Sequence, residues 1–178
     1  MKATGIVRRI DELGRVVVPK EIRRTLRIHE GDPLEIFTDK EGEIVLKKYS
    51  PMGEVGSLVK DLCQAIWSVE KCSIGVCDRD KVLAVTGSFA NGLKDGLVDS
   101  SMKYLMEERI RYDGQGMKTY YAGEEHIGKL RYAQPIIAEG DVTGCVFLIE
   151  DGTKKMASEI ERKMVDILTT FLGSQMES

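Results

Sequence analysis

The chain is poor in metal-binding side chains, with four cysteines and two histidines among 178 residues. Cys63, Cys72, Cys77 and Cys145 lack the paired short spacings of structural zinc sites, and no histidine lies close to them in the sequence. We therefore expect no metal and no cofactor, and we expect reduced thiols that pack as small apolar side chains. A metal site built on Cys72 and Cys77 is the weaker alternative.

Long apolar runs are also absent, because the chain holds no apolar stretch of 18 residues, and a transmembrane helix needs about 20. The opening segment MKATGIVRRI carries charges where a secretory signal has its apolar region. We therefore expect a cytoplasmic protein without a membrane partner. With 42% hydrophobic and 31% charged residues, the chain suits one large or two small globular domains.

Signatures of catalysis are missing as well. No serine lies in a G-x-S-x-G motif. The segment Gly123–Leu130 resembles a phosphate-binding loop, but Leu130 cannot bind Mg²⁺ and a strand, not a helix, is predicted to follow. We therefore predict that the protein is not an enzyme. A metabolite-converting enzyme with an incidental basic patch is a rival that these absences disfavour.

What the chain does have is a strongly uneven distribution of charge. Residues 1–27 hold eight Lys/Arg and three Asp/Glu, a net charge of +5, whereas the rest of the chain holds 18 and 26, a net charge of −8. A dense basic segment in a chain of formal net charge −3 is typical of a polyanion-binding surface. Nucleic acid is therefore expected to bind this end of the chain only.

The pattern of the first 50 residues predicts four short strands and one short helix. The strands are expected at 6–10, 16–18, 34–38 and 43–47, and the helix at 20–26, where Pro19 suits its first turn. Asp11 to Gly14 forms the turn of the first hairpin. A segment this small buries too little apolar surface to be stable alone, so interlocking with a second copy is expected.

Residues 51–55 are predicted to form a linker, with Ser50-Pro51-Met52-Gly53 marking its start, and residues 56–178 are predicted to form a second domain. Helices are expected at 55–69, 93–108 and 155–172, hairpins at 73–77 with 82–86 and at 131–138 with 142–149, and a glycine-rich loop at 111–129. This order predicts an α+β fold, an antiparallel sheet flanked by helices.

The stretch GIVRRIDELGRVVVPKEIRRTL, followed by GDPLEIF and EIVLKKY, resembles the AbrB-type swapped-hairpin transcription factors over roughly residues 1–50. The resemblance implies an intertwined, β-rich dimer that binds DNA through arginines, which fall here on Arg8, Arg15, Arg23 and Arg24. Residues 56–178 resemble a GAF domain, a small-molecule sensor fold. The combination resembles a family of sporulation regulators from spore-forming bacilli, which implies a transcription regulator of sporulation-stage genes.

The chemistry of the basic residues agrees with that implication. Arginine presents a planar fork of donors that suits phosphates and guanine edges; Arg9 and Lys20 are further candidates, although Arg9 could equally pair with Glu12. No recognition helix is evident, so recognition of the DNA sequence is expected to depend partly on DNA shape, with A·T-rich promoter regions preferred. The protein is accordingly expected to be nucleoid-associated. Activation and repression both stay open. An antitoxin of a toxin–antitoxin pair is the alternative function.

The second domain is expected to hold the assembly together and to sense an effector. Its first and last helices have apolar stripes that could also form a helical bundle with a second copy. If the first 50 residues pair with one copy and the second domain pairs with a different copy, the assembly is a homotetramer. Candidate residues of a ligand pocket are Ser88, Phe89, Tyr120, Tyr121 and His126. A filled pocket in a pure oligomerisation module is an equal alternative.

Overall fold

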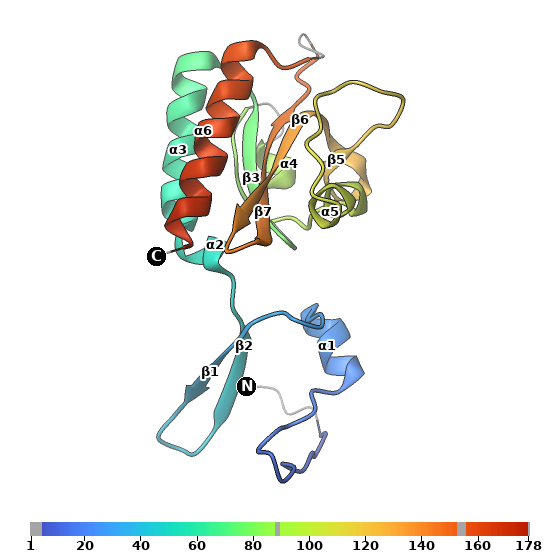
Figure 1. The fold of residues 1–178 in the computed structure, drawn as a ribbon, viewed down its shortest axis with the longest axis vertical. Helices are drawn as coiled ribbons and strands as arrows, with labels where there is room; N and C mark the ends of the chain where they lie inside the picture. The colour runs from blue at the N-terminus through green and yellow to red at the C-terminus, as the bar shows by residue number, and fades with distance from the viewer. Residues whose placement is uncertain (1–4, 88–89, 153–155, 178) are drawn as a thin grey trace. The chain divides into compact units, whose positions relative to one another are not determined.

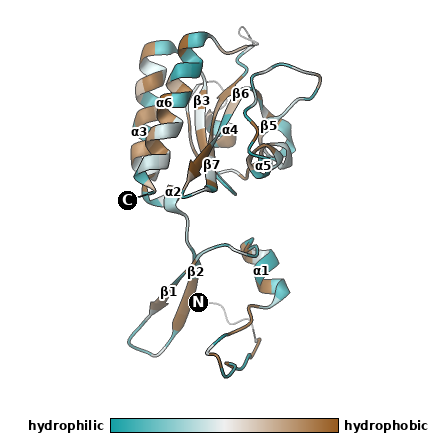
Figure 2. Ribbon diagram, viewed as in Figure 1, coloured by the Kyte–Doolittle hydropathy of each residue, from teal (hydrophilic) through white to brown (hydrophobic). Residues whose placement is uncertain are grey.

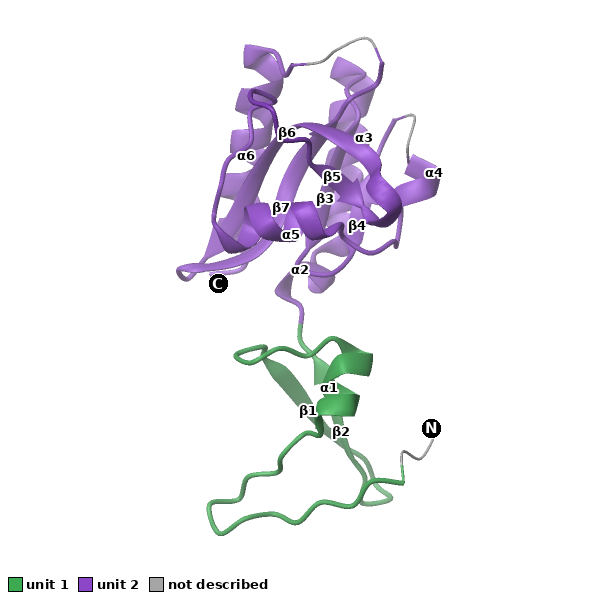
Figure 3. Ribbon diagram, turned by 90° about the vertical axis from the view of Figure 1, so that its right-hand side faces the viewer, with its two compact units in different colours: residues 1–49 green, residues 50–178 purple. Residues whose placement is uncertain are grey.

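The computed structural model describes residues 5–87, 90–152 and 156–177. The chain divides into two compact units, residues 1–49 and residues 50–178 (Figure 3). Within the described residues, no helix has both the length and the apolarity needed to cross a bilayer.

The described residues of unit 1, 5–49, form a helix, α1 (Lys20–Leu26), and a two-stranded antiparallel sheet of β1 (Leu34–Thr38) and β2 (Ile44–Lys48). The predicted bounds of α1 and β1 are confirmed, and β2 begins and ends one residue later than expected. The hairpin register pairs Leu34 with Lys48 and Thr38 with Ile44. At the turn, the Asp39 carboxylate accepts hydrogen bonds from the backbone N–H groups of Glu41 and Glu43.

The expected strands at 6–10 and 16–18 are not strands in the described single chain. The turn between them does form: the Gly14 N–H donates to the Asp11 carbonyl and the Asp11 N–H to the Arg15 carbonyl, each at 3.0 Å. Gly14 has φ +76°, which glycine adopts without steric cost. A strand requires a continuous partner for its backbone, whereas these two hydrogen bonds lie at the turn itself.

Unit 2 is an antiparallel sheet with helices on both faces (Figure 1). Its elements are α2 (Pro51–Glu54), α3 (Gly56–Glu70), β3 (Ile74–Asp78), β4 (Val82–Val85), α4 (Ala90–Leu93), α5 (Ser100–Glu107), β5 (Tyr121–Gly123), the 3₁₀ turn η1 (Glu124–His126), β6 (Ile127–Ala138), β7 (Asp141–Ile149) and α6 (Glu159–Gln175). The strand order is β4-β3-β7-β6-β5, and every pairing is antiparallel. The predicted α+β architecture is confirmed.

Two hydrophobic cores lie on opposite faces of this sheet, one beneath α2, α3 and α6 and one beneath α4 and α5. Alternate residues of a strand point to opposite faces, so β7 serves both cores. Val146 and Leu148 belong to the first, and Cys145, Phe147 and Ile149 to the second. Figure 2 shows hydrophobic residues along much of β7. The central strands are therefore buried on both sides.

Residues 51–55, expected as a linker, contain the short helix α2. Met52 is fully buried in the first core. Ser50, which precedes α2, donates its hydroxyl to the Asp78 carboxylate at 3.2 Å. This segment is thus packed and hydrogen-bonded within unit 2.

The helix expected over 93–108 is wrong in its first half, because the chain forms α4 and α5 with an irregular segment between them. Asp95 has φ +60°, which ends the helical path. Asp99 then starts α5, since its carboxylate accepts the backbone N–H of Ser101 at 2.8 Å as an N-cap. Gly96 lies in this irregular segment and interrupts the apolar spacing expected of one continuous helix.

Gly144 allows the close approach of β7 to β3. A Cβ at this position would lie 2.1 Å from the Cys77 carbonyl oxygen, an atom of the neighbouring backbone that cannot rotate away. We expect Gly144→Ala to lower the free energy of unfolding by about 2–3 kcal/mol. Gly56→Ala is the control, because nothing lies within 4 Å of a Cβ there. Urea titrations of the full chain at one protein concentration measure both; equal midpoints would contradict the prediction.

Candidate nucleic-acid interface

Asp11 organises the loop that carries Arg15. Its Oδ1 accepts the backbone N–H groups of Leu13 at 3.0 Å and Arg15 at 2.8 Å, and its Oδ2 accepts Nε of the Arg15 side chain at 2.9 Å. The backbone and side-chain hydrogen bonds from Arg15 lower the pKa of Asp11 below its usual value. The carboxylate is therefore charged at neutral pH and holds the arginine that faces solvent.

Helix α1 carries Arg23 and Arg24 in its last turn and buries none of its residues in the single chain. Arg27 ends the helix in the left-handed conformation, with φ +55°. The Ile28 N–H donates to the Arg23 carbonyl at 2.8 Å, and the Arg27 N–H donates to the Arg24 carbonyl at 3.3 Å. This closing pattern satisfies carbonyls that a helix end leaves open.

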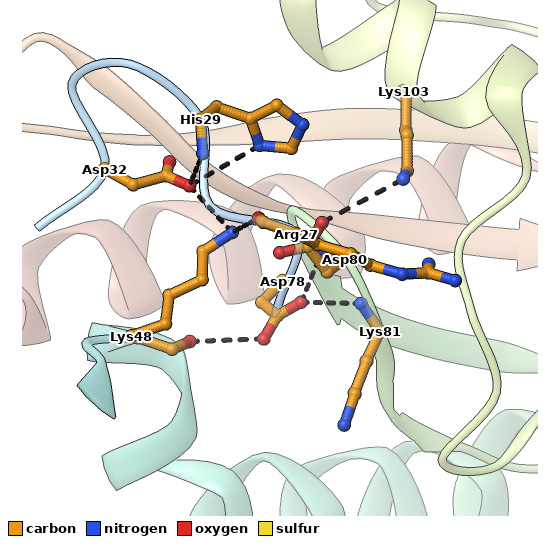
Figure 4. Close-up of polar contacts among 9 residues, drawn as sticks. Arg27, His29, Asp32, Lys48, Asp78, Asp80, Lys81 and Lys103 are labelled. Carbon is orange, nitrogen blue, oxygen red and sulfur yellow. Dashed lines mark hydrogen bonds and ion pairs between the residues drawn. The ribbon is translucent and has the colours of Figure 1, made fainter. Parts of the chain in front are cut away.

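A partly buried ion pair fastens the end of α1 to β2. Figure 4 shows the Lys48 ammonium between the Arg27 carbonyl and the Asp32 carboxylate, 2.9 Å from an oxygen of each. Burial by itself raises the pKa of Asp32, but the His29 backbone N–H and the Lys48 ammonium outweigh it, and the pKa is lowered. The charged pair thus holds the segment between α1 and β1.

The six predicted DNA-binding residues are all exposed in the single chain. They are Arg8, Arg9, Arg15, Lys20, Arg23 and Arg24. Arg23 and Arg24 share one helical turn, Arg15 lies at the hairpin turn, and Arg8 and Arg9 lie on the arm before it. The supporting carboxylates Asp11 and Asp32 were missed as site residues. Both lie at sequence signals for turns: Asp11 three residues before Gly14, and Asp32 within Gly31-Asp32-Pro33. These signals could have indicated them.

In unit 2, Tyr121 and His126 lie together beside Asp99. Their ring centroids are 4.7 Å apart, and Nδ1 of His126 lies 3.3 Å from Oδ2 of the buried Asp99 carboxylate. His126 itself is 69% exposed along its side chain. The Tyr121 N–H donates to the hydroxyl of Ser101 at 2.9 Å. This cluster is therefore anchored to the start of α5, and Asp99 and Ser101 are members that sequence reasoning missed.

Another candidate pocket residue, Tyr120, has a different aromatic partner. Tyr120 packs edge-on against Tyr112 at a centroid distance of 4.8 Å. Ser88 and Phe89 lie outside the described residues. Burial of Tyr112 raises the pKa of its hydroxyl. The described members of the predicted set thus separate into two pairs. In one, the exposed His126 lies beside the half-buried Tyr121; in the other, Tyr120 packs on Tyr112 of the second core.

The four cysteines are free thiols buried in the two cores. Burial, with a smaller effect of Cys72 nearby, raises the pKa of Cys63 to about 12. Burial also raises the pKa of Cys77 and of Cys145. These thiols are protonated at neutral pH and pack as apolar side chains, as expected from the sequence.

A basic, arginine-bearing unit joined to a GAF-like α+β unit is the architecture of a bacterial transcription regulator. A family model described as "Stage V sporulation protein T C-terminal, transcription factor" matches residues 54–177. The chain is 42% identical over 180 residues to stage V sporulation protein T of Bacillus subtilis (strain 168), across 99% of both chains. The chain belongs to the stage V sporulation protein T family of transcription factors.

Each unit also has relatives of its own. Over 51 residues, 29% of this chain and 52% of the relative, the chain is 67% identical to the transition state regulatory protein AbrB of Bacillus subtilis (strain 168). A second family model, "Antidote-toxin recognition MazE, bacterial antitoxin", matches residues 7–54. The solved GAF domain/HD domain protein from Geobacter sulfurreducens aligns with a TM-score of 0.50 and 16% identity, covering 72% of this chain and 96% of that one. The AbrB-type and GAF-like expectations are confirmed.

Proposed function

We propose that unit 1 binds double-stranded DNA, with A·T-rich promoter regions preferred, through Arg8, Arg15, Arg23 and Arg24. Arg9 and Lys20 add contacts to the phosphates. The observation that carries the proposal is that all six basic side chains are exposed on a segment of net charge +5. Arginine suits phosphates and guanine edges, and the family consists of transcription factors.

The DNA-binding form is a dimer of unit 1. Val7, Val17, Ile36 and Ile44 are 85%, 71%, 66% and 67% exposed in the single chain. Figure 2 shows hydrophobic residues along β1 and β2 of this unit. A second copy that supplies strands to residues 6–10 and 16–18 would cover these side chains and complete the ladders, as in a swapped hairpin.

A further contact between copies involves the helices of unit 2. Val69 of α3 is 76% exposed, and Ile160 and Ile167 of α6 are 59% and 69% exposed. Apolar side chains repeated on the outer faces of two helices are suited to a helical bundle with another copy. If this second contact uses a different copy from the first, the assembly is a homotetramer.

Unit 2 is a non-enzymatic module that senses a small-molecule effector near Tyr120, Tyr121 and His126. The bound effector alters the DNA binding of unit 1, and the protein acts as a nucleoid-associated regulator of sporulation-stage genes.

An antitoxin is the second candidate, because the MazE model matches residues 7–54. Antitoxins of this type use an unfolded segment to wrap a toxin, a mode typical of chains that order on binding. Unit 2 has two buried cores instead. Transcription regulation therefore accounts for more of the chain.

The salt dependence of binding tests the proposal. We expect fluorescence anisotropy of labelled duplexes with the full-length protein to give a slope of log affinity against log salt of roughly −5 to −7, if about six to eight phosphates are neutralised. An A·T-rich duplex should bind more tightly than a G·C-rich duplex of equal length. A slope near zero would reject DNA binding by the basic face, and equal affinities would reject the A·T preference alone.

A further inference from the structure

Asp11 divides its two oxygen atoms between two tasks. Oδ1 accepts two backbone N–H groups, those of Leu13 and Arg15, and so closes the turn. Oδ2 accepts Nε of the Arg15 guanidinium at 2.9 Å. One carboxylate therefore fixes both the backbone and the side chain of Arg15 at the turn.

The geometry leaves the outer edge of Arg15 available. A guanidinium has five N–H donors, one on Nε and four on the two Nη atoms. Asp11 occupies the Nε donor, and the Arg15 side chain is 70% exposed. The paired Nη groups form the fork that recognises two acceptors at once. An exposed ion pair of this kind adds little to stability, so its effect is to orient the fork.

The pairing also changes how Arg15 acts on DNA. Its positive charge is largely offset by Asp11, so it attracts phosphates less than an arginine without a partner. Within the described residues, the guanidinium groups of Arg23 and Arg24 have no carboxylate within ion-pairing distance. Arg23 and Arg24 are therefore suited to neutralise phosphates. The Arg15 fork, which Asp11 holds in place and largely neutralises, is suited to hydrogen bonds with a base edge.

We propose that Asp11 is a positioning residue for sequence readout, which holds the Arg15 fork so that it reads the O6 and N7 acceptors of a guanine. The inference rests on the proposed DNA binding by unit 1. It predicts one G·C base pair per half-site, within A·T-rich surroundings, at which the protein discriminates strongly. Asp11 acts through Arg15 and touches no base itself.

The test uses full-length protein and a duplex that the wild-type protein selects from a randomised pool. Each base pair is then replaced singly, and affinity is measured by anisotropy at several salt concentrations. For the wild type we expect one G·C-to-A·T replacement per half-site to lower affinity by about 10-fold or more. In Asp11→Asn, which keeps an oxygen acceptor for the turn, this loss should shrink to below about threefold, with the salt slope unchanged or steeper.

Three further variants separate positioning from a folding defect. Arg15→Lys keeps the charge and the backbone donor but lacks the fork, so it should lose the same discrimination while keeping the salt slope. Glu12→Gln, the matched loss of a neighbouring acidic charge, should keep the discrimination. The double variant Asp11→Asn/Arg15→Lys should discriminate against the G·C-to-A·T replacement as well as Arg15→Lys alone does, because the two changes affect the same contact between Arg15 and the base.

The outcomes are distinct for the two proposals. If Asp11→Asn or Arg15→Lys discriminates like the wild type, or the wild type has no such G·C position, the positioning role is wrong and DNA binding stands. If the wild-type protein shows no salt-dependent affinity for any duplex, the proposed function itself fails.

Discussion

Replacing Arg8, Arg15, Arg23 and Arg24 together by alanine should lower the affinity of the protein for duplex DNA by at least about 10³-fold. In a dimer of unit 1 the change removes eight exposed guanidinium groups, and each phosphate or base contact is worth about 1 kcal/mol or more. The slope of log affinity against log salt should also become much shallower, because fewer counterions are released. Anisotropy titrations of wild type and variant on the same duplex measure both effects.

A charge-matched control separates this effect from the change in net charge. Lys60, Lys94, Lys118 and Lys163 are exposed on unit 2, and their joint replacement by alanine removes the same four charges per chain. The proposed DNA contact lies on unit 1, and charges that make no contact with the DNA are largely screened at 0.1 M salt, so this variant should bind within about threefold of wild type. Equal losses in the two variants would mean that the arginines are not the interface. An unchanged elution volume on size exclusion checks that the assembly persists.

Glu161→Ala should lower the free energy of unfolding by about 3–5 kcal/mol, the largest loss of stability that we expect from one side chain. Glu161 and Arg131 are 1% and 0% exposed, and two hydrogen bonds of 2.8 Å join them. The substitution would leave a buried guanidinium without its carboxylate. It would also remove the capping box at the start of α6, in which Glu161 accepts the Ser158 N–H at 2.8 Å.

Glu159→Ala is the matched control on the same helix. Glu159 lies in the first turn of α6 and pairs with Lys163 at 2.8 Å, but both side chains are exposed. An exposed i,i+4 pair contributes below about 1 kcal/mol. Urea titrations at neutral pH should therefore shift the midpoint strongly for Glu161→Ala and little for Glu159→Ala. Similar midpoints in the two variants would show that the buried pair is not needed for stability.

The same pair predicts how stability depends on acid. Burial by itself raises the pKa of Glu161, but the hydrogen bonds from Arg131 and Ser158 outweigh it and lower the pKa from 4.5 to about 2. A carboxyl whose pKa is lowered by folding contributes its full stabilisation above pH 4.5 and loses it as the pH falls towards 2. The difference in unfolding free energy between wild type and Glu161→Ala should therefore shrink over that interval. A constant difference would contradict the assignment.

Local patterns predicted the parts of the fold that neighbouring residues control. Pro19 predicted the start of α1, which spans Lys20–Leu26 as expected. Asp11 and Gly14 predicted the hairpin turn, and the excess of arginine identified the basic unit. In each case the hydrogen bonds or charges lie within a few residues of one another.

By itself, then, the sequence determined that unit 1 is basic and AbrB-like, that unit 2 has an α+β fold, and which arginines face solvent. Tertiary structure alone decided which charges are buried and whether the segments 6–10 and 16–18 are strands. Arg131 and Glu161 are 30 residues apart, and no spacing rule connects them, because only the packing of α6 on β6 brings them together. Likewise the segments 6–10 and 16–18 have strand-like sequences, yet a strand forms only when a second backbone completes its ladder.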